Sequence, residues 1–384
     1  MPPITTPFVF ATTPSIVFGA GAIARIGALA ADRLGPRVLV VSDAGLVAAG
    51  LVAPAIAALE AAGSAVALFT DVVADPPEAI VEAAAAAARA HDATGIVGLG
   101  GGSSLDVAKL AALLAGSGEP LADAYGVGKA AGPRLPLLLA PTTAGTGSEV
   151  TPISIVTTGA HTKMGVVSPL LLPDVALLDP DLTLGLPAPV TAATGVDAMV
   201  HAIEAFTSAS PNANPVSKAL AREALRLLGG AIADACRDGA DGAARGAMLL
   251  GSMLAGQAFA NSPVAAVHAL AYPLGGRFGI PHGLSNALVL TQVMRFNLPA
   301  AEAAYAALGP CTFPDCPADA GAFIARLETL CAEIGLARRL RDVGVPEDAL
   351  DLLADDAMGQ TRLLVNNPRE VGRADALAIY RAAW

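Results

Sequence analysis

Residue types that bind transition metals fall in two stretches of this chain. The stretch GVDAMVHAIEAF places Asp197 and His201 four residues apart, which is the spacing of one helix face. The stretch VHALAYPLGGRFGIPHG holds His268 and His282, so three of the five histidines lie in these two segments. One carboxylate and three imidazoles suit Fe²⁺ or Zn²⁺ and offer too few oxygen ligands for Ca²⁺ or Mg²⁺. The two stretches therefore predict a single metal site.

A bend between His268 and His282 is needed for both histidines to reach one ion. On a continuous helix the two residues would lie about 21 Å apart, at 1.5 Å per residue. Pro273, the nearby glycines and Pro281 predict that one helix ends and another begins between them. Taken alone, an Asp–His pair such as Asp197 and His201 is more often a helix cap or a surface pair. The two remaining histidines are expected at the surface or in the core, namely His91 and His161.

A glycine-rich turn in the first half of the chain predicts a phosphate site. Gly100, Gly101 and Gly102 follow the strand-like run TGIVGL and precede the helical segment SSLDVAKLAALLAG. Glycines let backbone N–H groups approach a phosphate, and the helix N-terminus adds a positive dipole. Ser103 is expected to cap the helix and to donate to a phosphate oxygen, and Asp106 to orient the loop or reach an amide. The alternative is a plain tight turn between strand and helix.

Two further polar segments are expected at the same edge of a sheet. Asp43 ends the run VLVVSD, where a carboxylate can hold a ribose 2′-OH and repel a 2′-phosphate, which favours NAD over NADP. The loop PTTAGTGSEVTP (141–152) is rich in hydroxyl groups. These groups either contact a ligand, or the segment is an ordinary polar loop with no ligand. Its hydroxyl residues include Thr142, Thr143, Thr146 and Ser148.

A second glycine pattern competes for the role of phosphate loop. The segment FGAGAIA matches GxGxxA with Gly19, Gly21 and Ala24. The strand-like run before it, SIVF, is short and follows a proline-rich start. This segment is therefore the weaker candidate.

Alternating strand and helix patterns in the first half predict an α/β domain with a doubly wound parallel sheet. Strands are expected at 38–43, 64–73, 94–102 and 135–143, helices at 48–63, 76–92 and 103–116, and a hairpin at 153–158 and 163–169. Beyond Pro187 the pattern is almost wholly helical. Helices are expected at 190–208, 214–236, 241–260, 264–273, 282–296, 318–335, 346–358 and 371–383. The predicted domains are therefore residues 1–187 and an all-α domain over 188–384.

Composition excludes several classes of function. The net charge of −11 argues against nucleic acid, which requires clustered Lys and Arg. No segment offers the roughly 20 continuous apolar residues of a membrane span. No basic residue precedes Arg25, so no secretory signal is expected. The four cysteines form no CxxC pair, and CTFPDC is interpreted as a loop with incidental thiols rather than a metal half-site. A cytoplasmic protein is expected.

Taken together, GLGGGSSLDVAK, PTTAGTGSEVTP, GVDAMVHAIEA and the HxxxxxLGxxxxxPHG run resemble the iron-containing (group III) alcohol dehydrogenase family, over nearly the whole chain. The resemblance implies an NAD-binding domain, a helical metal domain and an active site in the cleft between them. It implies hydride transfer between NAD and a small alcohol, aldehyde, ketone or semialdehyde, and a homodimer. It implies that Gly100 to Ser103 hold the pyrophosphate and that FGAGA does not. The other implied cofactor contacts are Asp43, Asp106, Thr142, Thr143, Thr146 and Lys163; the implied metal ligands are Asp197, His201, His268 and His282.

Two residues depart from the family pattern. Tyr272 stands where many members carry a histidine proposed to move protons, so it is expected either to relay protons through its hydroxyl or only to shape the pocket. Asp75 stands where many members carry asparagine. Three alternatives to an alcohol dehydrogenase remain: a glycerol dehydrogenase, a dehydroquinate synthase type of enzyme, and a catalytically weak metal- and nucleotide-binding protein.

Overall fold

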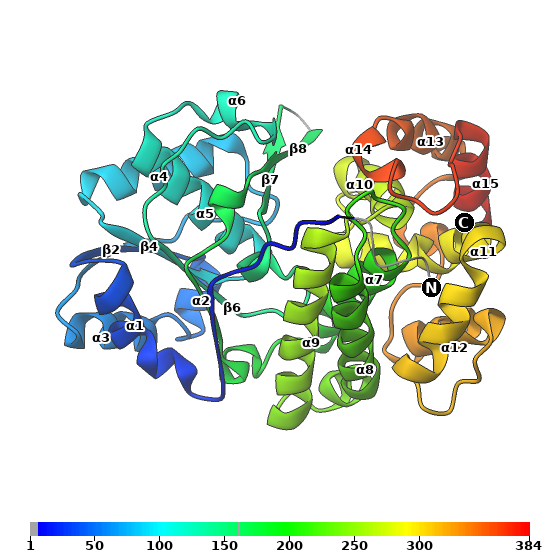
Figure 1. The fold of residues 1–384 in the computed structure, drawn as a ribbon, viewed down its shortest axis with the longest axis horizontal. Coiled ribbons are helices and arrows are strands. Elements are labelled where there is room, and N and C mark those ends of the chain that lie inside the picture. Colours follow the sequence, from blue (N-terminus) through cyan, green and yellow to red (C-terminus); the bar gives the residue numbers. More distant parts are fainter. Residues whose placement is uncertain (1–6, 160–161) are drawn as a thin grey trace. The chain divides into compact units, whose positions relative to one another are not determined.

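The computed structural model describes residues 7–159 and 162–384, which form two compact units (Figure 1). The sheet unit spans Thr12–Leu184, and the helical unit spans Gly185–Trp384 together with the described residues up to Ala11. The sequence had assigned the N-terminal segment to the sheet unit. It groups with the helical unit because Ala11 N donates to Asn261 Oδ1 at 2.6 Å and Asn261 Nδ2 donates to Ala11 O at 2.8 Å. His161 lies outside the described residues.

The sheet unit is built on six parallel strands in the order β1-β9-β6-β4-β2-β3. The strands are β1 (Ser15–Phe18), β2 (Arg37–Val41), β3 (Ala65–Phe69), β4 (Gly95–Gly100), β6 (Leu137–Pro141) and β9 (Val175–Leu178). The predicted doubly wound parallel sheet is confirmed. Strand β9 was not predicted, because its four residues are too few to show a period in a loop-rich segment.

Helices cover both faces of this sheet. They are α1 (Ile26–Arg33), α2 (Ala44–Ala48), α3 (Ala53–Ala61), α4 (Glu78–Ala90), α5 (Gly102–Ser117) and α6 (Leu121–Ala124). Alternate residues of β2 enter the two cores: Val38 and Val40 pack with α1 and α3, and Leu39 and Val41 with α4 and α5. The single helix predicted over 48–63 is wrong, because Gly50 adopts φ +76° and separates α2 from α3.

The predicted hairpin forms as β7 (Ile153–Thr158) and β8 (Thr162–Val167), which pair antiparallel. The two strands do not extend the parallel sheet. They form a separate three-stranded sheet with β5 (Gly126–Val127), which pairs with β8. Helix α5 is joined to this small sheet because Lys109 Nζ donates to Ile153 O at 2.8 Å.

The second half is all-helical, as predicted. Its helices are α7 (Ala188–Thr207), α8 (Pro215–Arg237), α9 (Gly242–Asn261), α10 (Ala266–Phe278), α11 (His282–Thr312), α12 (Ala320–Glu333), α13 (Leu350–Met358), α14 (Thr361–Leu364) and α15 (Arg373–Ala383). Helices α7, α8 and α9 lie side by side (Figure 1). Helix α11 runs through Pro299 and Pro310, well beyond the predicted end at 296.

The bend between His268 and His282 exists, but it is narrower than predicted. Pro273 and the two glycines after Leu274 lie inside α10, which ends only at Phe278 and is followed by the C-cap Gly279 with φ +64°. Pro281 then caps the start of α11. An interior proline costs a helix about 3 kcal/mol. Helix α10 continues through Pro273 because most of its residues are buried, and tertiary packing outweighs the local propensity.

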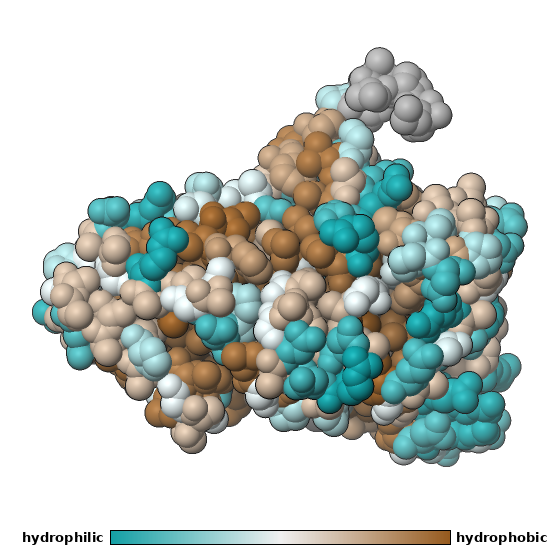
Figure 2. All heavy atoms as spheres, turned by 90° about the horizontal axis from the view of Figure 1, so that it is seen from below, coloured by the Kyte–Doolittle hydropathy of each residue, from teal (hydrophilic) through white to brown (hydrophobic). Residues whose placement is uncertain are grey.

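Among the described residues, no helix combines the length and the apolar composition that a bilayer span requires. The face drawn in Figure 2 carries hydrophilic residues between hydrophobic ones. The helices of the second half bury apolar side chains, among them Val200 of α7, Leu228 of α8 and Leu249 of α9.

Candidate metal centre and nucleotide site

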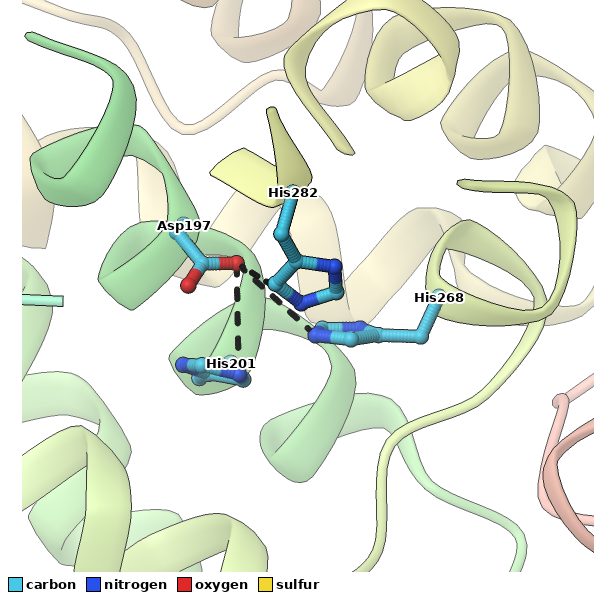
Figure 3. Close-up of side chains that lie close together, drawn as sticks. All are labelled: Asp197, His201, His268 and His282. Atoms are coloured by element: carbon cyan, nitrogen blue, oxygen red, sulfur yellow. Dashed lines mark ion pairs between the residues drawn. The ribbon is translucent and has the colours of Figure 1, made fainter. Parts of the chain in front are cut away.

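Three helices bring the four predicted ligands together in the helical unit (Figure 3). Helix α7 supplies Asp197 and His201, the first turn of α10 supplies His268, and α11 begins at His282. Asp197 Oδ1 lies 4.0 Å from His201 Nε2, 3.9 Å from His268 Nε2 and 3.6 Å from His282 Nε2. The ligand atoms of all four residues lie within 4.8 Å of one another.

The donor set fits a divalent transition metal. Nitrogen and oxygen ligands bind Zn²⁺ at about 2.0–2.2 Å, so ligand atoms around one ion lie up to about 4.4 Å apart. The separations from Asp197 Oδ1 agree with this range. Asp197, His201 and His268 are buried, whereas the side chain of His282 is 40% exposed. The group is thus enclosed on the side of α7 and open beside His282.

The ionised form of Asp197 is favoured by its neighbours. Burial alone would raise the pKa of Asp197, but His201, His282 and His268 hold that pKa below its usual value. Asn286 contributes as well, because its Nδ2 donates to Asp197 Oδ1 at 2.6 Å. A carboxylate that stays charged in a buried position is what a cation requires of its ligand.

Glu204 is a member of this group that the sequence prediction missed. Its Oε2 lies 2.7 Å from His268 Nδ1 and accepts from the backbone N of Ala265 at 3.0 Å, and its Oε1 accepts from Val267 N at 2.7 Å. Glu204 follows His201 by three residues in GVDAMVHAIEAF and so lies on the same helix face, but the sequence does not show that it meets His268.

Aromatic rings surround the histidines. His201 stacks between Phe259, with ring centroids 4.3 Å apart, and His268, with centroids 4.7 Å apart. Tyr272 follows His268 by one turn of α10, and its ring centroid lies 5.8 Å from that of His282. Tyr272 therefore lies beside the most exposed of the four ligands.

The residues predicted to bind the nucleotide lie at the point where the strand order of the sheet reverses. Strand β2 pairs with β3 on one side and with β4 on the other, so the strand order reverses between β2 and β4. Ligands of doubly wound sheets bind outside the carboxyl ends of strands at such a point. Asp43 follows β2, and the glycine turn follows β4. A Cβ built on Gly100 would lie 3.2 Å from Leu46 of α2, so the two segments are adjacent.

The glycine turn packs against the hydroxyl-rich loop. A Cβ on Gly102 would lie 2.7 Å from Thr146 Cγ2, so any other residue at 102 would force the side chain of Thr146 to shift. A Cβ on Gly101 would lie 3.6 Å from Thr143 Cγ2, an ordinary contact. The backbone N of Thr142 donates to Gly100 O at 2.9 Å. The structure thus brings the three glycines and the three threonines together.

The capping residue of α5 differs from the prediction, and two carboxylates of this unit have partners within the chain. Gly101, and not Ser103, is the N-cap of α5. Asp106 Oδ1 accepts from Ser148 Oγ at 2.6 Å and Asp106 Oδ2 accepts from Ile155 N at 2.8 Å, so this carboxylate joins α5 to the loop and to β7. Asp43 is the N-cap of α2 and accepts from Leu46 N at 3.0 Å.

Lys163 lies on β8 and is paired with Asp75. Lys163 Nζ lies 2.5 Å from Asp75 Oδ1 and donates to Thr157 Oγ1 at 3.1 Å. Asp75 adopts φ +52°, a conformation in which asparagine and aspartate are several-fold enriched. Asp75, which replaces the asparagine of many family members, therefore forms an ion pair with Lys163.

In the competing glycine segment, FGAGAIA, backbone N–H groups are already hydrogen-bonded to a side chain of the protein. Asp179 is fully buried and accepts from the backbone N of Gly21 at 3.0 Å and of Ile23 at 2.8 Å. The strand before this turn, β1, is at the edge of the sheet. A carboxylate of the chain thus takes the N–H groups that a phosphate would need.

The hydroxyl-rich loop contains one buried ionisable residue, Glu149, and contacts another, Lys109. Lys109 and Glu149 are both buried, and Lys109 Nζ donates to Thr151 O at 3.0 Å. Burial lowers the pKa of Lys109 to about 8, although Asp106 and Glu149 oppose this change. Burial raises the pKa of Glu149 to about 7, against the effect of Lys109.

Two sequence models of one protein family match almost the whole chain. The model described as "Iron-containing alcohol dehydrogenase" matches residues 13–180, and "Fe-containing alcohol dehydrogenase family, C-terminal" matches residues 191–384. Similar proteins include long-chain-alcohol dehydrogenase 1 of Geobacillus thermodenitrificans (strain NG80-2), 43% identical over 361 residues that cover 92% of this chain and 91% of that protein. The 4-hydroxybutyrate dehydrogenase of Cupriavidus necator is 40% identical and covers 90% of this chain and 91% of its own.

Solved structures share the fold over nearly their full length. A 1,3-propanediol oxidoreductase superposes with a TM-score of 0.94 at 35% identity and covers 98% of this chain and 100% of its own. A sulfoacetaldehyde reductase of Bifidobacterium kashiwanohense in complex with NAD⁺ gives a TM-score of 0.89 at 31% identity, with 98% of each chain covered.

Proposed function

Because the chain belongs to the iron-containing alcohol dehydrogenase family, whose members are NAD- and metal-dependent oxidoreductases acting on CH–OH groups, we propose that Asp197, His201, His268 and His282 bind the catalytic metal. The observation that carries this proposal is the convergence of one carboxylate and three imidazoles from three helices on one point. Fe²⁺ and Zn²⁺ both suit this donor set.

A divalent metal, when bound, supplies Lewis acidity to the oxygen of the alcohol or carbonyl group. The residues of the chain prepare the site for this chemistry. Asp197 contributes the negative charge, and Asn286 holds the carboxylate in position through its amide nitrogen. The exposed side of His282 leaves room for a small substrate.

NAD is bound by the sheet unit in this proposal. Gly100, Gly101, Gly102 and the backbone at Ser103 receive the pyrophosphate at the start of α5. Asp43 receives the adenosine ribose, because an ionised carboxylate has lone pairs for further donors besides Leu46 N. The remaining contacts come from Thr142, Thr143, Thr146 and Lys163. Asp106 acts indirectly, since its two oxygens hold the loop and β7.

Tyr272 is proposed to handle the substrate proton. Its ring lies beside His282, and a tyrosine hydroxyl both donates and accepts hydrogen bonds. In the direction of carbonyl reduction, the hydroxyl donates toward the developing alkoxide. In the opposite direction it accepts the proton of the alcohol.

The proposed reaction is reversible hydride transfer between NAD and a small alcohol, aldehyde, ketone or semialdehyde. The protein is proposed to act in the cytoplasm and to form a homodimer. The relatives include proteins named for long-chain alcohols, 4-hydroxybutyrate and 1,3-propanediol, which supports this substrate class. A panel of aldehydes and semialdehydes with NADH tests it, together with metal analysis of protein purified without added metal. The His268→Ala variant is expected to lose both bound metal and turnover. A variant that keeps both would contradict the proposed metal site.

A further inference from the structure

Glu204 links the histidine from α10 to the helix that carries two other ligands. It is buried on α7, and its carboxylate accepts from Ala265 N and Val267 N and lies within hydrogen-bond distance of His268 Nδ1. All three contacts measure 3.0 Å or less. Ala265 is the N-cap of α10, Val267 and His268 lie in its first turn, and α10 has no capping side chain of its own.

The contact with Glu204 decides which nitrogen of His268 carries the proton. Both oxygens of Glu204 already accept from backbone N–H groups, those of Ala265 and Val267, so the carboxylate acts as an acceptor and His268 Nδ1 carries the hydrogen. The Nε2 atom of His268 then presents its lone pair toward Asp197. The contact of Asn286 agrees with this assignment, because its Nδ2, which donates to Asp197 Oδ1, also lies 3.3 Å from His268 Nε2.

We infer that Glu204 is a positioning residue of the metal site: it fixes the tautomer and the ring orientation of His268 and holds the first turn of α10 against α7. This inference rests on the proposed metal site. Histidine ligands of metals are commonly oriented by a carboxylate on the other ring nitrogen, and loss of that carboxylate typically weakens metal binding about 10–100-fold.

A glutamine at position 204 separates the orienting role from simple side-chain packing. Glutamine keeps the shape of glutamate but places an NH₂ group where one oxygen accepted hydrogen bonds. The NH₂ group then faces either Val267 N or the pair formed by Ala265 N and His268 Nδ1. A residue that only filled space would not be affected by this change.

The first test measures Co²⁺ binding to the full-length protein, by chelator competition and by the visible absorption of the bound ion. The Glu204→Gln variant is expected to bind Co²⁺ about 10–100-fold more weakly, with an altered absorption spectrum. Glu328→Gln is the matched control, since Glu328 pairs with Arg295 and contacts none of the ligands. Wild-type affinity and spectrum in Glu204→Gln would overturn the inference. Wild-type protein that binds no Co²⁺ would instead contradict the proposed metal site.

A second test uses the unaltered sequence and so remains decisive if Glu204→Gln fails to fold. Two-bond ¹H–¹⁵N correlations on histidine-labelled, metal-free protein report the tautomer of each of the five imidazoles. At a pH well above the ordinary histidine pKa of about 6.5, His268 is expected as the Nδ1–H form. His91 is the reference for the other tautomer. Its Nε2 lies 3.0 Å from the carbonyl oxygen of Ala65, which can only accept a hydrogen bond, so His91 is expected as the Nε2–H form. An Nε2–H form of His268 would overturn the inference.

Discussion

The rings of Tyr272 and His282 lie 5.8 Å apart and are tilted by 51°, although the two residues belong to different helices. Tyr272 stands on α10, one turn after His268, and His282 begins α11. The narrow bend at Gly279–Pro281 is what brings a potential proton donor next to the exposed ligand.

Replacing Tyr272 tests its role in proton transfer. The Tyr272→His variant is expected to keep activity and to move one limb of the pH profile of kcat toward lower pH, because imidazoles ordinarily titrate near 6.5 and phenols near 10. Tyr272→Phe is expected to lower kcat about 100-fold or more, the usual contribution of a general acid or base. Unchanged profiles in both variants would reduce Tyr272 to a packing residue.

Replacing Asp43 by serine tests the preference for NAD without removing the helix cap. Serine is as good an N-cap as aspartate, so the melting temperature of Asp43→Ser is expected to stay close to that of the wild type. Loss of the charge is expected to raise kcat/KM for NADPH about tenfold or more, since 1.4 kcal/mol of repulsion corresponds to tenfold. Equal discrimination against NADPH in variant and wild type would remove Asp43 from the ribose site.

The glycine turn can be tested with a pair of alanine variants. Gly101→Ala has room for its methyl group, so the protein is expected to fold normally but to bind NADH about tenfold more weakly, because the methyl group keeps the phosphate from the backbone. Gly102→Ala is expected to lower stability as well, because its methyl group collides with Thr146. Calorimetric titration with NADH and thermal unfolding separate the two effects. Unchanged NADH affinity in Gly101→Ala would favour a plain tight turn.

The buried Glu149 makes stability depend on pH in a defined direction. Because its pKa rises from 4.5 to about 7 on folding, the folded protein binds more protons than the unfolded chain within this window. The contribution of Glu149 to stability is therefore lost as pH rises from 4.5 to about 7. Glu149→Gln lacks this loss, so its melting temperature relative to wild type is expected to increase by a few degrees across the window. A constant difference at all pH values would contradict the prediction.

The candidate metal ligands could be predicted because histidine is rare in this chain and because the spacing of these residues indicates a shared helix face or a bend. Asp197, His201, His268 and His282 stand out in a chain with five histidines, and the structure brings all four together. Glu204 lies in the same motif but could not be recognised, because its role depends on α10 presenting His268 to it. Contacts between distant helices leave no periodic signal in the sequence.

The parts of the fold that differed from expectation are those where tertiary contacts override local preference. Pro273 predicted a helix end, yet burial carries α10 onward to Phe278. Ser103 is a better intrinsic cap than glycine, yet the N-cap of α5 is Gly101, two residues earlier, and Gly102 in the first turn packs against Thr146. The N-terminal segment groups with the helical unit through Asn261, a partner 250 residues away from Ala11.

The origin of the four proposed ligands on three separate helices would give the metal a second role, in the lifetime of the protein. An ion held by α7, α10 and α11 would cross-link them, and binding energy of this kind adds directly to folding stability. The melting temperature of the helical unit is then expected to rise with the concentration of free metal and to fall on addition of a chelator. In a cell short of metal, the empty chains would unfold more often and be degraded first, so metal supply would control the abundance of this enzyme as well as its turnover.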